Sequence, residues 1–184
     1  MSDKKVPGRS TLLSDNRYAE RLEKNDIRIW DLTADRQLYL LSGAAGGGMA
    51  MSPDGKAFAS ASNADRMARI FDLATGEQRH ALPDGIGGSS AMTFSPDGSL
   101  LVSANYDNDV RIWKTRTGEL VRKIEELTGA MFAAEFTPDG KHLVMGGLDE
   151  TIYILDAATF QPVKQLKGHG ETISALAVSP DGRT

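Results

Sequence analysis

Short segments in which apolar and polar residues alternate recur along the chain, and polar turns separate them. In the best-defined stretch, residues 89–95 alternate small or polar residues with Met92 and Phe94, as a half-buried strand does. Pro96-Asp97-Gly98 then favours a tight turn, because proline presets φ, aspartate bonds its own backbone and glycine accepts a positive φ. Three further strands are predicted over residues 100–104, 110–113 and 119–124. The pattern therefore predicts units of four short antiparallel strands.

The same unit returns at a constant period. A Pro-Asp-Gly turn preceded by Ser or Thr recurs at steps of 43, 42 and 42 residues, with its first residue at Ser52, Ser95, Thr137 and Ser179. A second marker, of the type Ile-Trp-Asp, recurs at steps of 41, 42 and 42 residues from Ile29, Ile70, Ile112 and Ile154. Two independent markers with one period of about 40–45 residues are typical of a β-propeller, in which each repeat forms one four-stranded blade.

The strand inventory comes to about four blades. We expect an N-terminal segment, residues 1–25, with a partial strand near residues 10–14 and an insertion at residues 20–26, where the composition of residues 18–24 also favours a helical turn. Propeller repeats follow near residues 26–42, 47–82, 89–125, 131–167 and, in part, 172–184. Three N-terminal strands, three complete repeats and one more first strand at residues 172–179 make sixteen strands.

These strands predict an all-β chain of four-stranded antiparallel blades that forms an incomplete ring. The chain ends just after a turn that normally begins another strand, which favours a fragment of a longer propeller. Two alternatives stay open: the sixteen strands close across the termini as four blades, or two copies join into one eight-bladed ring. Propellers have four to eight blades, so both are feasible.

From Asp26 to its end the chain resembles the WD-repeat family. The resemblance rests on Trp-Asp pairs or their variants, on an aspartate six residues before the tryptophan position, and on a Gly-His pair. The residues that match these motifs, or stand at the corresponding places of the repeat, are Trp30, Asp31, Asp65, Phe71, Asp72, Ser103, Asp107, Trp113, Asp149, Asp156, Gly168 and His169. In the family, the aspartate, histidine, a Ser or Thr and the tryptophan form a hydrogen-bonded set, so this resemblance implies a structural role for them.

The match is incomplete in two repeats. The sequence Gly-Ile-Gly-Gly at residues 85–88 occupies the place of the Gly-His pair in the repeat of Trp113, and Lys24 replaces the aspartate in the first repeat. Only His169 fills the histidine position, and its aspartate and tryptophan partners would lie beyond Thr184.

The resemblance implies a scaffold that binds a protein or peptide partner through the face lined by the fourth-to-first and second-to-third strand loops. We expect the partner to contact exposed residues of the second-to-third strand turns: Asn63, Arg66, Tyr106, Asn108, Leu148 and Glu150. Tyr106 is the strongest candidate because aromatic residues are enriched in interface hot spots. Two alternatives stay open: a sensor domain of a larger protein, and a lactonase-like propeller enzyme, which the sequence Thr151-Ile152-Tyr153-Ile154-Leu155-Asp156 also resembles.

Composition and chemistry favour a binding protein over an enzyme. The net charge of −4 and the scattered basic residues argue against nucleic acid as the main partner. The chain lacks cysteine and any apolar run of about 20 residues, so we expect no disulfide, no membrane span and a cytoplasmic location. The three histidines show no metal-ligand spacing, and the glycine-rich residues 43–48 lack the Lys and Ser or Thr of a phosphate-binding loop. We therefore expect no catalytic residues, metal or cofactor, but self-association through uncovered blade surfaces.

Overall fold

The described residues of the protein form sixteen β-strands. The structure is a computed structural model that describes residues 10–12, 16–22, 25–44, 46–62, 64–83 and 89–182 of the 184-residue chain. The first eight strands are β1 (Ser10–Leu12), β2 (Arg17–Arg21), β3 (Ile27–Asp31), β4 (Arg36–Leu41), β5 (Met49–Met51), β6 (Ala57–Ser62), β7 (Met67–Asp72) and β8 (Gln78–Leu82). The other eight are β9 (Ser89–Phe94), β10 (Leu100–Asn105), β11 (Val110–Lys114), β12 (Leu120–Ile124), β13 (Met131–Phe136), β14 (His142–Gly147), β15 (Ile152–Asp156) and β16 (Pro162–Leu166).

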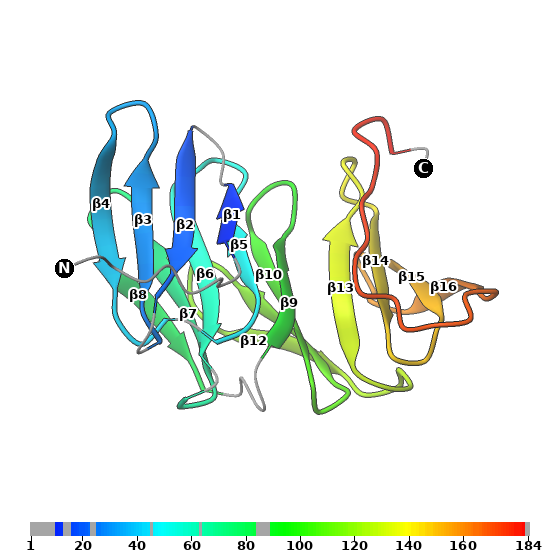
Figure 1. The fold of residues 1–184 in the computed structure, drawn as a ribbon. Coiled ribbons are helices and arrows are strands. Elements are labelled where there is room, and N and C mark those ends of the chain that lie inside the picture. Colours follow the sequence, from blue (N-terminus) through cyan, green and yellow to red (C-terminus); the bar gives the residue numbers. More distant parts are fainter. Residues whose placement is uncertain are drawn as a thin grey trace.

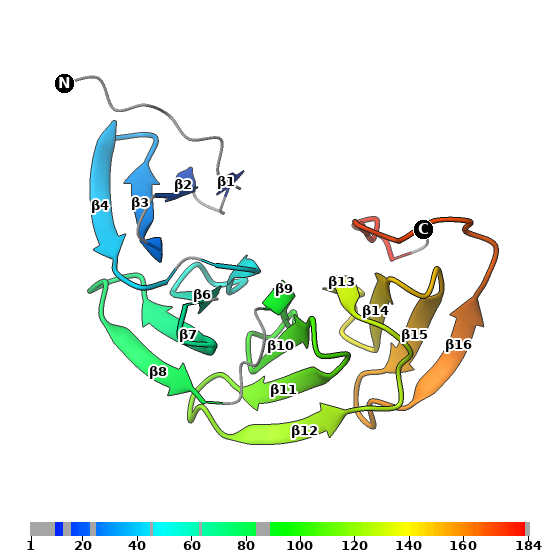
Figure 2. The ribbon, with the colours of Figure 1, turned by 60° about the horizontal axis from the view of Figure 1, so that its bottom comes forward.

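The strands form four antiparallel sheets, each made of four strands that follow one another in the sequence. We number them blades 1 to 4, from β1–β4 to β13–β16. Figures 1 and 2 show the blades side by side in an open arc, with the first strand of each blade on the inside and the fourth on the outside. The prediction of an all-β fold built from four-stranded blades that leave the ring open is therefore confirmed.

Two details at the ends of the arc differ from the prediction. Blade 1 has four strands rather than three, because residues 17–21 form β2 where the composition favoured a loop or helical turn. Ala19 lies opposite Ile29, and both are fully buried against blade 2, so tertiary packing overrides the local preference. Residues 172–179 are not a strand. They contact blade 4 through isolated hydrogen bonds, such as that from the Ile173 amide to the Gly147 carbonyl, and through packing of Ile173 on Gly146, without a strand ladder.

The Pro-Asp-Gly turns have one geometry in every repeat. The glycines have φ between 68° and 70°, a conformation that favours residues without a Cβ atom: Gly55, Gly98, Gly140 and Gly182. The preceding hydroxyl group donates a hydrogen bond to the turn aspartate in the pairs Ser52–Asp54, Ser95–Asp97, Thr137–Asp139 and Ser179–Asp181. This hydroxyl bond is the main reason that the pKa of Asp54, Asp97 and Asp139 lies below its ordinary value. The recurring aspartates thus serve turn chemistry.

The apolar core lies between the blades. Between blades 1 and 2 it contains Ala19, Ile27, Ile29, Leu41, Phe58, Phe71 and Leu73. Between blades 2 and 3 it contains Ala57, Ala59, Ala61, Ala68, Ile70, Leu82, Met92, Phe94, Leu101 and Trp113. Between blades 3 and 4 it includes Val102, Val110, Ile112, Ile124, Leu143, Met145, Tyr153 and Leu155. Each blade is therefore stabilised mainly by its neighbours.

Candidate protein-interaction surface

The candidate binding residues lie in the loops between the second and third strands of blades 2, 3 and 4, at the lower end of these blades in Figure 1. Their side chains are exposed: Arg66, Tyr106, Asn108, Leu148 and Glu150. Asn63, the remaining candidate, lies outside the described residues. We call this set of loops, residues 64–66, 106–109 and 148–150, the loop face.

The loops share one backbone geometry. Arg66, Asn108 and Glu150 stand at equivalent positions with φ of 60°, 66° and 61°. This left-handed conformation is uncommon for residues other than glycine, and its recurrence shows that the turn shape is set by the repeat. The preceding aspartate contributes, because Asp65 and Asp149 accept hydrogen bonds from the amides of Met67 and Thr151. The structure therefore holds these loops in a regular turn.

An aromatic pair bridges two blades at the loop face. Tyr106, from the β10–β11 loop of blade 3, packs against Phe132 of β13 in blade 4, with ring centroids 5.6 Å apart and planes tilted by 59°. Tyr106 nevertheless keeps 48% of its surface exposed, and Leu148 keeps 56%. Such a tilted arrangement is favourable for two aromatic rings and fixes the tyrosine while leaving its surface available.

Phe132 also lines a hollow on the inner side of the arc. This hollow, about 370 Å³ in volume, lies between the first strands of blades 2, 3 and 4 and residues 174–176. Small and apolar residues such as Met49, Met92 and Phe132 line it together with Ser90 and Ser174. The loop face thus adjoins, through Phe132, a shallow depression lined by both apolar and polar groups.

A network of buried charged side chains stabilises the β10–β11 loop. The guanidinium of Arg111, with only 2% of its side chain exposed, forms contacts of 2.6 and 2.7 Å with the carboxylate of Asp109. Asp109 also accepts one hydrogen bond from the Asn105 side chain at 3.1 Å and contacts Lys123 at 3.0 Å. Asp107 lies 3.6 Å from Arg111. The Asp109 carboxylate and the cations of Arg111 and Lys123 therefore fix the loop that carries Tyr106.

Burial raises the pKa of Asp107, and the neighbouring Asp109 carboxylate raises it further. A carboxyl with a raised pKa keeps its proton in the folded state at pH values where the unfolded chain has released it, so its ionisation lowers stability as pH rises through that window. We expect Asp107→Asn to increase stability relative to the wild type at neutral pH and to have less effect in acid. Urea unfolding at both pH values measures this.

The control for this prediction is Asp139→Asn, because the pKa of Asp139 is lowered by the Thr137 hydroxyl. The stability that Asp139 contributes is present above its unfolded pKa and is lost as pH falls through its folded pKa. Asp139→Asn should therefore reduce stability at neutral pH and little in acid. Shifts of the same sign in both variants would contradict the assignment for Asp107.

The residues that resemble family motifs lie in the blades, but their contacts differ from blade to blade. Trp113 is 1% exposed and donates from its indole Nε1 to the Ser103 hydroxyl at 3.1 Å. Trp30 instead donates to the Glu20 carboxylate at 3.2 Å. Asp31, Asp72 and Asp156 accept backbone hydrogen bonds in the turns between third and fourth strands. Phe71 is buried between blades 1 and 2.

The three aspartates before the third strand also have different partners. Asp65 forms an ion pair with Arg69, Asp107 lies near Arg111, and Asp149 accepts hydrogen bonds from Thr128 and Tyr153. Lys24 and residues 85–88, where the sequence departs from the family pattern, lie outside the described residues.

The three histidines lie on different elements. His80 on β8 donates from Nε2 to the Arg116 carbonyl at 3.0 Å, and its ring packs where a Cβ on Gly118 would stand, so it joins blades 2 and 3. His142 is half-buried on β14. Gly168 and His169 lie in an exposed segment after β16. Within the described ranges, no group of three or more His, Asp or Glu side chains could hold a metal ion.

The described part of the chain contains no helix that is both long and apolar enough to cross a membrane.

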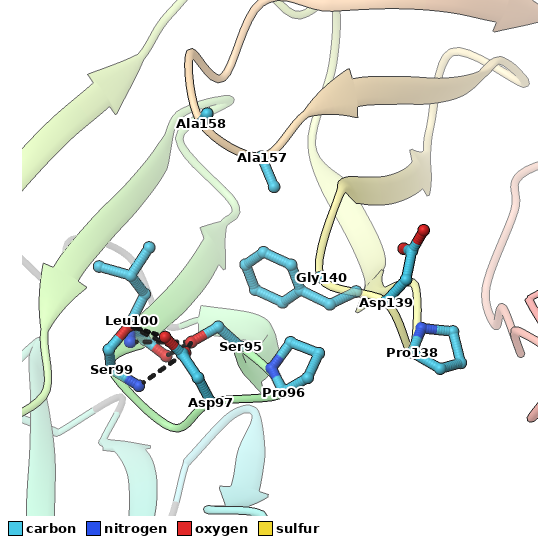
Figure 3. Close-up of a pocket in the computed structure, with 11 residues that line it drawn as sticks. Ser95, Pro96, Asp97, Ser99, Leu100, Pro138, Asp139, Gly140, Ala157 and Ala158 are labelled. Carbon is cyan, nitrogen blue, oxygen red and sulfur yellow. Dashed lines mark hydrogen bonds between the residues drawn. The ribbon is translucent and has the colours of Figure 1, made fainter.

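A second hollow, about 380 Å³ in volume, lies at the opposite end of blades 3 and 4. Figure 3 shows the prolines of two Pro-Asp-Gly turns, Pro96 and Pro138, along one side of it and Ala157 and Ala158 along another. The Asp97 carboxylate accepts hydrogen bonds from the hydroxyl groups of Ser95 and Ser99, and the Asp139 carboxylate accepts one from Thr137. The carboxylates of this hollow are thus engaged within their own turns, which makes the loop face the stronger candidate.

The sequence did not predict that Phe132 and the Asp109–Arg111 pair are parts of the candidate site. Phe132 lies on a predicted strand, and its contact with Tyr106 crosses from one repeat to the next. Asp109 and Arg111 flank Val110, so both side chains point to one side of the chain, and this spacing is the signal that could have indicated the pair.

Comparisons with known proteins agree with the repeat geometry. The family model described as WD domain, G-beta repeat, matches residues 79–114 and 160–184. Over 56 residues the chain is 39% identical to the uncharacterized WD repeat-containing protein sll1491 of Synechocystis. The aligned region makes up 30% of this chain and 16% of that relative, so the chain spans much less than two thirds of the relative's length.

Proposed function

We propose that this chain, in which the WD-repeat model matches residues 79–114 and 160–184, is a non-catalytic platform that binds a protein or peptide at its loop face. The observation that carries the proposal is the Tyr106–Phe132 pair, which bridges two blades beside the hollow on the inner side of the arc. WD40 repeats generally mediate contacts between proteins, which supports this class of function. Nucleic acid is a poorer fit because the chain carries a net negative charge.

The surface suits a peptide with an apolar or aromatic side chain. Tyr106 and Leu148 expose about half of their surface on neighbouring loops, while Phe132 and the network of Asp109 and Arg111 hold the tyrosine loop in place. A large apolar side chain held in advance loses little conformational entropy on binding. The peptide side chain would enter the hollow between the inner strands and stack beside the aromatic pair.

The arrangement of titratable groups supports a binding role over catalysis. The turn aspartates accept hydrogen bonds within their own turns, and His80 donates a hydrogen bond to the Arg116 carbonyl. General acid–base catalysis needs such groups to converge on one reacting atom. The cysteine-free sequence is compatible with a reducing compartment, and we place the protein in the cytoplasm in this proposal.

Selection of peptides from a random library on the purified chain, followed by calorimetry, tests this function. We expect selected peptides to carry an aromatic or branched apolar residue, and Tyr106→Ala to weaken their binding by roughly tenfold or more. Val163→Ala is the matched control, because Val163 is 57% exposed on β16, away from the loop face. Failure to select any binder, or equal binding by the Tyr106 variant, would overturn the proposal.

A further inference from the structure

The hollow between the Pro-Asp-Gly turns of blades 3 and 4 has a mostly apolar wall. Phe136, Pro96, Pro138 and Ala157 line it, and both prolines are exposed (Figure 3). A Cβ added to Gly140 would lie 3.8 Å from the Cδ atom of Pro96, so the turns of the two blades contact each other. The hollow is therefore formed where two packed blades meet, and its wall suits the aliphatic part of a side chain.

Two carboxylates give the hollow a negative charge. Asp97 and Asp139 line it from neighbouring turns, and no cationic side chain is among the described residues that line it. The Ser95 hydroxyl holds the pKa of Asp97 below its ordinary value, and the Thr137 hydroxyl does the same for Asp139. Both carboxylates are therefore ionised at neutral pH, and the hollow attracts a cation.

The charge of Asp97 is not offset in the way that is usual for these turns. In blades 2 and 4 the lysine two residues after the turn aspartate pairs with it, at 3.7 Å in both cases: Lys56 with Asp54 and Lys141 with Asp139. In blade 3 this position is taken by Ser99. The chain thus provides no cation for Asp97 at the position where the other two blades have one.

Asp97 also keeps capacity for another hydrogen-bond donor. Its Oδ1 atom accepts hydrogen bonds from the Ser95 hydroxyl and from the Ser99 amide at 3.0 Å. Its Oδ2 atom lies 2.8 Å from the Ser99 hydroxyl, which lies equally far from Oδ1. An ionised carboxylate has about four acceptor sites on its two oxygens, so Oδ2 can accept a further donor.

The corresponding place between blades 1 and 2 holds an arginine of the chain itself. Arg17 is the first residue of β2, as Leu100 is the first residue of β10. The half-buried Arg17 side chain donates a hydrogen bond from Nη1 to the Gly55 carbonyl at 3.0 Å. Gly55 belongs to the Pro-Asp-Gly turn of blade 2, as Gly140 belongs to that of blade 4. Between blades 3 and 4 the shorter, apolar Leu100 therefore leaves open a place that a guanidinium fills between blades 1 and 2.

We propose that this hollow binds an arginine side chain of a protein partner. The guanidinium donates to the Gly140 carbonyl, as Arg17 does to Gly55, and to the Asp97 carboxylate, while the methylene groups lie on Pro96. Arginine fits better than lysine, because its planar guanidinium can donate to a carbonyl and a carboxylate at once and is more weakly hydrated. The site lies at the opposite end of the blades from the loop face and does not depend on the function proposed for that face.

Titration of the 184-residue chain with N-acetyl-L-arginine methylamide, followed by nitrogen–proton correlation NMR spectra, tests this site. We expect saturable shifts of the Ser99, Gly140 and Ala158 amide signals, with a dissociation constant in the millimolar range for a single side chain. The corresponding lysine derivative should bind roughly threefold or more weakly, since it lacks the planar fork. The norleucine derivative, which has no charge, should cause no saturable shift at these amides.

Two variants of the hollow should weaken binding of the arginine derivative. Asp97→Asn keeps an oxygen for the Ser95 hydroxyl and removes the charge, so it should weaken binding roughly three- to fivefold, the range of a partly exposed ion pair. The matched control is Asp54→Asn, which makes the same change in the turn of blade 2 and should leave binding unchanged. Leu100→Arg places a guanidinium where Arg17 has one, and should abolish binding because the side chain occupies the site.

Several outcomes would overturn the proposal: no saturable shift at the three amides, equally tight binding of the lysine or norleucine derivative, or equal weakening by Asp54→Asn and Asp97→Asn. If Leu100→Arg does not fold, the two asparagine variants decide. Tyr106→Ala should leave the titration unchanged, since Tyr106 lies at the loop face. Loss of peptide binding in that variant together with an unchanged titration would show that the two surfaces act separately.

Discussion

Trp113→Ala is expected to lower the free energy of unfolding by about 3–5 kcal/mol, the usual loss for truncating a large aromatic residue in a core. Trp113 is the largest fully buried side chain of the described residues and packs between blades 2 and 3 among alanines, Ile70 and Leu82. Small neighbours cannot move in to fill the space. The variant would also remove the indole donor from the Ser103 hydroxyl. Urea unfolding, followed by far-ultraviolet circular dichroism, measures the loss.

Two variants separate the causes of that loss. Trp113→Phe keeps most of the packing and removes the hydrogen bond to Ser103, so it should cost only about 1–2 kcal/mol. Trp30→Ala is the positional control, since Trp30 occupies the same place in blade 1 but is half-buried, and about 1–2 kcal/mol is expected for it. Equal losses for Trp113→Ala and Trp30→Ala would contradict the view that interblade burial sets the energy.

Asp109→Ala is expected to lower the free energy of unfolding by about 3–5 kcal/mol at neutral pH, because it leaves a buried charge without its partner. The Arg111 side chain is 2% exposed and makes its two short contacts with Asp109 alone. Asp107, at 3.6 Å, is too far to replace them. The same urea experiment measures the change, and thermal unfolding supplies an independent value.

The matched control is Asp65→Ala in blade 2. Asp65 pairs with Arg69 at the position equivalent to Arg111, but the aspartate side chain is 46% exposed and that of the arginine 14%. Water can solvate the guanidinium after the change, so we expect a loss of about 1 kcal/mol or less. If both variants lost the same stability, burial would not be the reason for the large effect of Asp109→Ala.

The repeat period predicted the blades because each repeat contains its own turns and strand pairs. The Pro-Asp-Gly turns and the alternating strands around Met92 and Val110 are local features, and they appear in the structure within a few residues of the expected bounds. At the ends of the arc this local reading fails. Residues 17–21 form a strand through pairing with β3. Residues 172–179 make isolated hydrogen bonds with blade 4 and do not form a strand.

The candidate site was predictable only in part, for the same reason. The exposed turn residues, including Tyr106 and Leu148, follow from the position of each turn in the repeat. The contact between Tyr106 and Phe132 joins two repeats, and the hollow beside it needs inner strands from three blades. Such features depend on how blades stand next to one another, which a repeat pattern does not encode.

The side-chain volumes at the three interblade contacts also specify the order of the blades. Trp113 faces the alanine-rich blade 2, whereas its counterpart Leu155 faces Val102 and Val110 of blade 3, so each contact matches large residues with small ones in its own way. Interiors packed at this density tolerate neither a void nor an excess methyl group without loss of stability. A chain with blades 3 and 4 exchanged would place Leu155 against the alanines of blade 2 and Trp113 against Ile152 and Ile154 of blade 4. The side chains of each repeat therefore fit one particular neighbour. Duplication or shuffling of a repeat would require matched substitutions on both blades of the new contact.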